Sequence, residues 1–196
     1  MIPDGFVSAL DCFEAIVSRV PAGRWAAPSP CEGWCAADVV GHVIGDLRGI
    51  QAYATGRPPG SAADPRSAAG DDPLAAWRAA RADMMVTLDA AALARTVQLP
   101  WGGDMTLHEF VARYPLEILV HAWDLAQATG QAAVLDPDLV HGALETAHLF
   151  APAGRAAGLI GPERAVPADA DDLTRLLALF GRNSTGTATR SPAGSG

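Results

Sequence analysis

Long hydrophobic runs are missing from this chain of 196 residues. None approaches the roughly 18–20 apolar residues that a helix needs to cross a lipid bilayer. The N-terminal segment MIPDGFVSALDCFEAIVSRV carries early acidic residues and no positively charged stretch, so we expect no signal peptide. Both absences favour a soluble, cytoplasmic protein.

Positive charge is also scarce. The chain has 22 acidic residues against 14 basic ones, which gives a net charge of −8, and the basic residues are scattered arginines. Such a chain repels phosphate backbones and anionic lipid surfaces, so we expect no nucleic acid and no membrane as a partner. The expected partner is a small-molecule substrate, and a homodimer is a further expectation.

Cysteine is rare as well, with Cys12, Cys31 and Cys35 as its three copies. They are too few and too clustered for a disulfide framework, and we interpret Cys31 and Cys35 as small buried hydrophobic residues. A thiolate metal site of Cys31 and Cys35 with His42 is an alternative, although this spacing suits no standard zinc module. The G-x-S-x-G, P-loop, H-E-x-x-H and dinucleotide-binding motifs are all absent.

What the sequence does contain is helical periodicity. Apolar residues recur at three- and four-residue steps, and convincing strand pairs are lacking. We therefore predict an all-α fold, a four-helix bundle with an additional short C-terminal helix. The helices are expected over about residues 4–20, 36–54, 73–88, 106–129, 137–150 and 173–181.

The segments between these helices are rich in Gly, Pro, Ser and Ala. We expect a long mobile loop over 55–72, a short extended piece near 96–105 and a loop over 151–170. Residues 1–182 are predicted to form one domain. Residues 183–196 are small and polar, and we expect them to be a disordered tail.

The helix over 106–129 has the clearest boundaries. Thr106 and Glu109 match a capping box, and Gly130 is a typical C-terminal stop. Pro115 lies inside this span, so we expect a kink there, because proline removes one backbone hydrogen bond and clashes with the preceding turn.

A narrow polar sector runs along the same helix. At about 100° per residue, Glu117, His121 and Asp124 share one side, while the rest of the circumference after Pro115 is almost wholly apolar. Such a helix is expected to be buried with its polar sector facing a cleft. Glu117 and His121 stand one turn apart, so both can bind one metal ion. A solvent-facing Glu–His pair, or His121 donating to Asp124, is the simpler alternative.

A catalytic zinc ion typically has three protein ligands and an open position. The candidate for the third ligand is His42, at the edge of the apolar face of the helix over 36–54. A histidine at such a position is more often a packed interface residue than a ligand. His108, His141 and His148 are most simply surface or packing residues.

Three motifs together resemble a known family. They are W-x-x-P-S-P-C-x-G-W at residues 25–34, D-V-V-G-H at 38–42 and E-x-x-x-H-A-W-D-L-A-x-A-T-G at 117–130. In this combination the chain resembles the actinobacterial mycothiol-dependent maleylpyruvate isomerases of the DinB-like metal-binding superfamily. The closing segment 161–183 is similar to the end of short single-domain members, so the resemblance covers about residues 5–182.

The resemblance implies a DinB-like bundle that holds a divalent metal, usually zinc. The implied ligands are His42, Glu117 and His121, and Asp124 is implied to orient a ligand or to shape the pocket. We therefore take these four residues as the candidate catalytic set. The sequence departs from the family at Cys35, where a threonine commonly caps the second helix. It also lacks the second C-terminal domain of the isomerase proper, so maleylpyruvate isomerisation is not carried over.

Three functions are open at this point. The first is a metal-dependent enzyme that transfers or adds a low-molecular-weight thiol, mycothiol, to an electrophilic small molecule. The second is a thiol-independent metal-dependent hydrolase, lyase or cyclase, and the third is a non-catalytic ligand-binding bundle. For any of them we expect the pocket to be lined by Trp34, Trp101, Tyr114 and the loop over 55–72.

Overall fold

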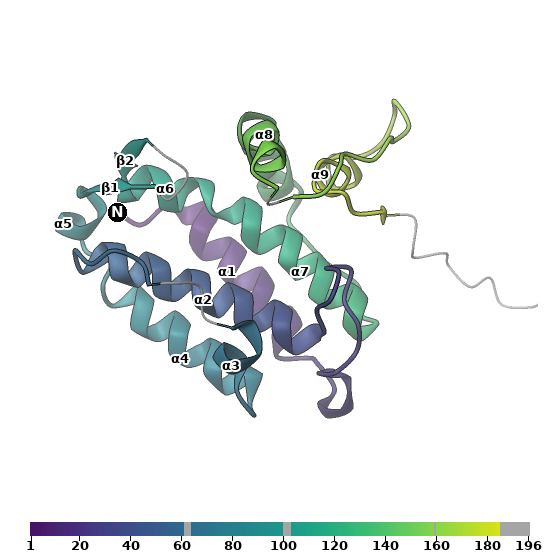
Figure 1. Cartoon of the computed structure of the whole chain (residues 1–196), viewed down its shortest axis with the longest axis horizontal. Coiled ribbons are helices and arrows are strands. Elements are labelled where there is room, and N and C mark those ends of the chain that lie inside the picture. The colour runs from purple at the N-terminus through teal and green to yellow at the C-terminus, as the bar shows by residue number, and fades with distance from the viewer. Residues whose placement is uncertain (61–63, 100–102, 159, 185–196) are drawn as a thin grey trace, which may run out of the picture.

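The computed structural model describes residues 1–60, 64–99, 103–158 and 160–184, and helices dominate it (Figure 1). The elements, in chain order, are α1 (Asp4–Val17), the 3-10 turn η1 (Ala22–Arg24), α2 (Ala36–Ala54), α3 (Pro65–Ala69), α4 (Pro73–Met85), α5 (Ala90–Leu93), β1 (Thr96–Gln98), β2 (Asp104–Thr106), α6 (Leu107–Arg113), α7 (Pro115–Thr129), α8 (Pro137–Ala156) and α9 (Asp172–Leu179). The predicted all-α fold is confirmed.

Four helical segments form the bundle. Helices α1, α2 and α4 run alongside the consecutive pair α6 and α7, with α2 packed against both α4 and α7 (Figure 1). Helix α8 packs on α7 from outside the bundle, and α9 packs on α8. The predicted short C-terminal helix therefore reaches the bundle by way of α8.

The core is built from the apolar faces that the periodicity predicted. The expected inward residues of α2 are all buried, namely Val40, Val43, Ile44, Leu47 and Ile50. On α1 the buried stripe includes Phe6, Leu10 and Phe13, and the Phe13 ring lies 4.7 Å from that of Trp77 on α4. Burial of such side chains, at about 1.5–3 kcal/mol each, supplies most of the driving force that holds the helices of the bundle together.

The residues predicted to begin and end the helix over 106–129 have the expected capping interactions. Thr106 and Glu109 form the capping box, and Gly130 ends α7 in the left-handed region at φ 72°. The predicted interruption at Pro115 spans a single residue: α6 ends at Arg113, Tyr114 keeps right-handed helical dihedrals, and α7 begins at Pro115. Proline is well suited to the first position of a helix, because the missing N–H would have no partner there.

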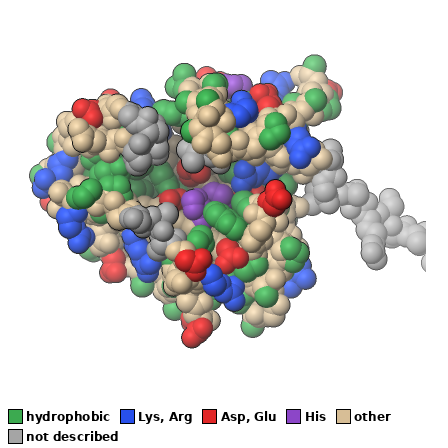
Figure 2. Space-filling view, viewed as in Figure 1, with side chains coloured by type: hydrophobic (Ala, Val, Ile, Leu, Met, Phe, Trp, Pro, Cys, Tyr) green, Lys and Arg blue, Asp and Glu red, His purple; other side chains and the backbone are tan. Residues whose placement is uncertain are grey.

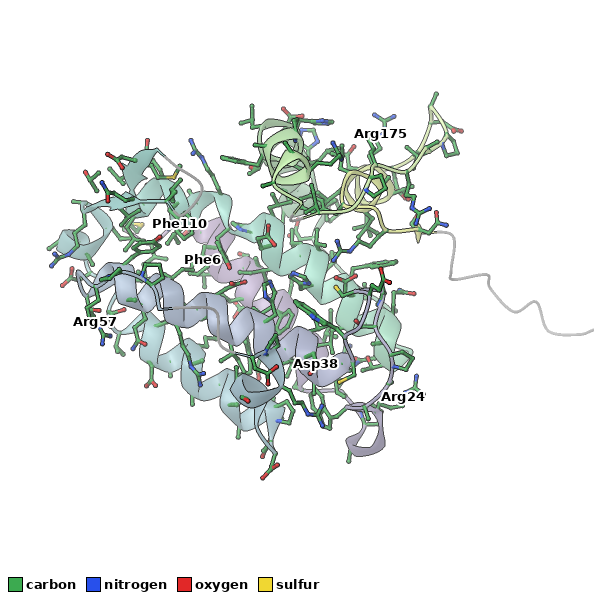
Figure 3. All side chains as sticks on the ribbon, viewed as in Figure 1. Phe6, Arg24, Asp38, Arg57, Phe110 and Arg175 are labelled. Carbon is green, nitrogen blue, oxygen red and sulfur yellow. The ribbon has the colours of Figure 1, made fainter. Side chains whose placement is uncertain are left out.

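Cys35 precedes α2 at the position where the family commonly has a threonine, which is a better helix cap than cysteine. The backbone N–H of Cys35 donates to the Asp38 carboxylate at 2.8 Å, which closes a capping box at the start of α2. Asp38 is labelled at this end of α2 in Figure 3. The acidic partner three residues into the helix thus compensates for the weak side chain at the cap.

Three local predictions are wrong. The segment 55–72 contains the short helix α3, whose start is capped by Asp64, so it is not a continuous loop. Helix α8 continues to Ala156 through Pro152, beyond the predicted end at about residue 150. Strands β1 and β2 form a small antiparallel hairpin, where we expected no strand pair. For α3 the overlooked signal is local, since Asp64 and Pro65 form a helix start like that of Asp72 and Pro73.

A glycine contact fixes α3 on α2. A Cβ atom at Gly41 would overlap the carbonyl oxygen of Pro65, so the two backbones approach more closely than any side chain permits. No helix among the described residues is long and apolar enough to cross a membrane. The predicted disordered tail lies outside the described residues, except for Asn183 and Ser184.

Candidate metal centre

Helix α7 supplies three of the candidate site residues. It is buried over nearly its whole length, as predicted, and its polar sector faces α2 and the C-terminal segment rather than bulk solvent. The side chains become less exposed along the helix, from 42% for Glu117 to 8% for His121 and 0% for Asp124. Glu117 therefore lies at the opening and Asp124 at the bottom of the site.

His42 reaches the same place from α2. One ligand atom from each of His42, Glu117 and His121 lies within 4.8 Å of the other two. The His42 and His121 rings are 4.7 Å apart, and Nε2 of His121 is 3.8 Å from Oε2 of Glu117. Histidine side chains show in a hollow at the centre of the face in Figure 2, where α2 and α7 run together in Figure 1.

The donor set is chemically suited to a divalent metal. Two imidazoles and one carboxylate are the ligands of many catalytic zinc sites. Burial, followed by the charge of the neighbouring His121, lowers the pKa of His42 to about 3, so this ring is neutral and keeps a free electron pair. The residues present therefore fit a zinc-type ion.

Asp124 holds His121 from the side opposite Glu117. Its Oδ2 lies 3.1 Å from Nδ1 of His121, so the carboxylate accepts from Nδ1–H and leaves Nε2 directed toward Glu117. Burial raises the pKa of Asp124, but hydrogen bonds from His121 and Arg182 outweigh burial and bring the pKa down to about 2. Burial by itself would lower the pKa of His121, but hydrogen bonds with Asp124 and Cys31 and the charges of Asp124 and Glu117 together outweigh burial and raise the pKa to about 10. A metal bound at Nε2 would therefore have to displace the proton that this nitrogen carries.

Two further residues belong to this cluster: Arg182, which no sequence motif singled out, and Cys31, which was expected at most as a thiolate ligand. Arg182 donates to both oxygens of Asp124, through Nη2 at 2.8 Å and Nε at 3.3 Å. Cys31 donates its thiol to the same carboxylate at 3.1 Å. Cys31 and Cys35 are half-buried with polar contacts, so their interpretation as buried hydrophobic residues is wrong. All three cysteines are free.

A second group of possible metal ligands consists of Cys31, His121 and Asp124. The Arg182 guanidinium contacts this group directly, with Nη2 at 3.1 Å from Sγ of Cys31. A cation placed there would be repelled by the guanidinium charge. The group containing His42 and Glu117 is therefore the better candidate.

Asp46 is a further neighbour of the site. Its Oδ2 is 3.3 Å from Nε2 of His42, one turn earlier on α2, and it accepts a hydrogen bond from the buried Tyr114 hydroxyl. Burial raises the pKa of Asp46 to about 7, with the hydrogen bond from Tyr114 opposing the shift. The spacing from His42 to Asp46 equals that from Glu117 to His121, which is the sequence signal that could have identified it.

The predicted pocket lining is only partly tested. Trp34 packs against both imidazoles, with ring centroids 5.0 Å from His42 and 6.2 Å from His121. A surface hollow of about 540 Å³ runs from Trp34 to Pro65 and Arg66, within the segment 55–72. Tyr114 lies below the site among Phe6, Phe110 and Asp46, and Trp101 falls outside the described residues.

The remaining histidines lie away from the site. His108, His141 and His148 are exposed, as expected for surface residues. His141 on α8 pairs with Asp172 on α9 at 2.8 Å. None of the three belongs to a group of possible metal ligands among the described residues.

Comparisons with known proteins identify the family of this chain. A family model described as the mycothiol maleylpyruvate isomerase N-terminal domain matches residues 7–126. This chain belongs to that family. An uncharacterized protein of Mycobacterium tuberculosis, found in two strains, is 33% identical over 180 residues, which are 89% of this chain and 93% of that protein. The resemblance seen in the sequence is confirmed.

The mycothiol maleylpyruvate isomerase family is also represented among solved structures. Crystal structures of the mycothiol-dependent maleylpyruvate isomerase and of a mutant of it match this chain with a TM-score of 0.57 and 19% identity. The match covers 75% of this chain and 66% of the crystallised one, so the chain spans about two thirds of that protein's length. At this identity the likeness shows a shared fold.

Proposed function

We propose that this chain is a metal-dependent enzyme that adds mycothiol, or a similar low-molecular-weight thiol, to an electrophilic small molecule. His42, Glu117 and His121 would hold the divalent metal, which we expect to be zinc. The observation that carries the proposal is the convergence of their donor atoms within 4.8 Å, from two helices that are far apart in the sequence. Membership of the mycothiol maleylpyruvate isomerase family supports the thiol.

The chemistry that zinc supplies when bound is a lower pKa for a coordinated thiol, which is then a thiolate near neutral pH. The chain's own residues prepare the site for this. Asp124 fixes the orientation of His121, and Trp34 covers both imidazole rings on one side. Glu117 is exposed enough to leave the opening accessible.

The net reaction forms one C–S bond. With an epoxide, the carbon–oxygen bond breaks and the thiol proton ends on the released oxygen. With a quinone, sulfur adds to a ring carbon and the proton ends on the product. Neither reaction needs an oxidant or a reductant, so the metal centre and the thiol are sufficient.

The metal is tested by elemental analysis of the purified chain. We expect one divalent ion per chain, and we expect Glu117→Gln to lower its occupancy because an amide is a poorer ligand than a carboxylate. Glu145→Gln is the matched control, since Glu145 is exposed on α8. A wild-type chain without metal, or equal occupancy in all three proteins, would contradict the proposed site.

The thiol is tested separately. Zinc-loaded protein is mixed with mycothiol and a panel of epoxides and quinones, and adducts are measured by mass spectrometry. We expect adduct formation that depends on metal and is lost in His121→Ala. Turnover without thiol would instead favour the metal-dependent hydrolase, lyase or cyclase, and inactivity with every class of substrate would favour a ligand-binding bundle.

A further inference from the structure

The C-terminal segment contributes a side chain to the bottom of the site. Arg182 follows α9, yet its guanidinium lies against Asp124 on α7, with only 14% of the side chain exposed. Nε and Nη2 each donate a hydrogen bond to one carboxylate oxygen, so the contact is bidentate. The family model ends at residue 126, so this contact comes from outside the matched region.

The end of α9 fixes the position of Arg182. The N–H of Gly181 donates to the carbonyl of Ala178, and the N–H of Arg182 donates to that of Leu177. These two bonds form a Schellman motif, which needs a left-handed residue, and Gly181 has φ 76°. The backbone of Arg182 is therefore fixed by the helix end before its side chain makes any contact.

The hydrogen bonds of Arg182 separate a positioning role from a substrate-binding role. Nη1 donates to the carbonyl of Phe180 at 2.9 Å, while Nη2 and Nε donate to Asp124. Each of the three guanidinium nitrogens is thus engaged within the protein. An anionic substrate would have to displace a buried carboxylate to reach them.

We propose that Arg182 is a positioning residue of the metal centre, which holds Asp124 so that His121 presents Nε2 to the metal. The inference rests on the proposed function, because it assumes that His121 is a ligand. A carboxylate bonded to a metal-binding histidine sets the orientation of its ring, and loss of such a partner typically weakens metal affinity by about 10–100-fold. Arg182 acts on the metal centre through this carboxylate. The C-terminal helix is then part of the site rather than an accessory to the bundle.

The test compares metal affinity across variants of the full chain, by competition with a chromophoric zinc chelator. We expect Arg182→Ala to weaken zinc binding by about 10-fold or more. Arg182→Lys keeps the charge but cannot make the bidentate contact, so its zinc affinity should lie between those of Arg182→Ala and wild type. Arg175→Ala removes the same charge from α9 and is the control, since Arg175 bonds only loop carbonyls and points away from α7 (Figure 3).

A spectroscopic readout separates positioning from general loss of structure. In zinc-loaded wild type, NMR of isotope-labelled histidine should show a protected Nδ1 proton on His121. This signal should be lost or shifted in Arg182→Ala and kept in Arg175→Ala. If Arg182→Ala does not fold, as judged by circular dichroism, the comparison of Arg182→Lys with wild type decides.

The outcomes distinguish this inference from the proposed function. A wild-type chain that binds no zinc overturns both. Zinc binding without thiol chemistry overturns the proposed reaction and leaves the role of Arg182 in place. Zinc affinities within about twofold in wild type and the folded Arg182 variants, with an unchanged Nδ1 signal, overturn the role of Arg182 alone.

Discussion

Single residues show most clearly how charge is buried in this protein. Asp124 has no exposed surface, and His121, Arg182 and Cys31 all donate to it. A buried carboxylate is costly unless its oxygens are fully paired, so the three donors explain how the charge is tolerated. Removing the charge leaves Arg182 without its counterion in a largely buried place.

We therefore expect Asp124→Asn to lower the free energy of unfolding by about 3 kcal/mol, measured by urea denaturation. Asp172→Asn is the matched control. It breaks the exposed pair with His141, where solvent screens the charges, and its effect should be far smaller. Equal losses in the two variants would show that Asp124 is not a buried, charged partner of Arg182.

His141 gives a pH prediction at the same scale. The hydrogen bond that His141 donates to Asp172, together with the charge of that carboxylate, raises the pKa of His141 above the ordinary value of 6.5. The stabilisation from the pair of His141 and Asp172 is therefore fully present below the unfolded-state pKa of His141. It is lost as the pH rises through the folded-state pKa. An NMR titration should find a raised pKa in wild type and an ordinary one in Asp172→Asn. The same pKa in both proteins would refute the pairing.

Among the elements, α2 combines a very close backbone approach with a proposed metal ligand. Gly41 contacts the backbone of α3, and His42 follows it directly. The α2–α3 contact is therefore adjacent to the candidate site, so a change in α3 packing acts on the helix that carries His42.

Two glycines of α2 make a matched test of this contact. Gly41→Ala should destabilise the protein by about 2 kcal/mol, because the new methyl group overlaps the carbonyl of Pro65. A Cβ at Gly45 meets nothing within 4 Å, so Gly45→Ala should stabilise the protein by about 0.5–1 kcal/mol through helix propensity. The Tm of each variant, measured by thermal denaturation, tests both expectations. A stabilising Gly41→Ala would mean that α3 does not lie against α2.

For the whole molecule, the proposed metal joins α2 to α7 across the core. Any ligand that binds only the folded state adds stability, and zinc at 100 times its Kd adds about 2.7 kcal/mol. Zinc should therefore raise the Tm of wild type in scanning calorimetry, and a chelator should reverse the change. Glu117→Gln should show a much smaller increase. The same zinc effect in wild type and Glu117→Gln would place the ion elsewhere.

The sequence by itself determined what is local. The bounds of α2, the capping box of Thr106 and Glu109, and the stop at Gly130 depend on residues within one or two turns, so the periodicity and capping rules predicted them. The pairing of Glu117 with His121 is also local, since one helical turn separates them. The proposal of His42 needed the family resemblance as well.

Only the tertiary structure decided which distant side chains meet. His42 lies near α7 because α2 and α7 share an apolar core, and no spacing along the chain encodes that distance. Arg182 contacts Asp124 across 58 positions of sequence, through a helix end that no pattern links to α7. The short elements β1 and β2 depend on contacts outside themselves, so packing rather than propensity stabilises them. Local hydrogen bonding selects helices, whereas the burial that brings them together depends on the whole chain at once.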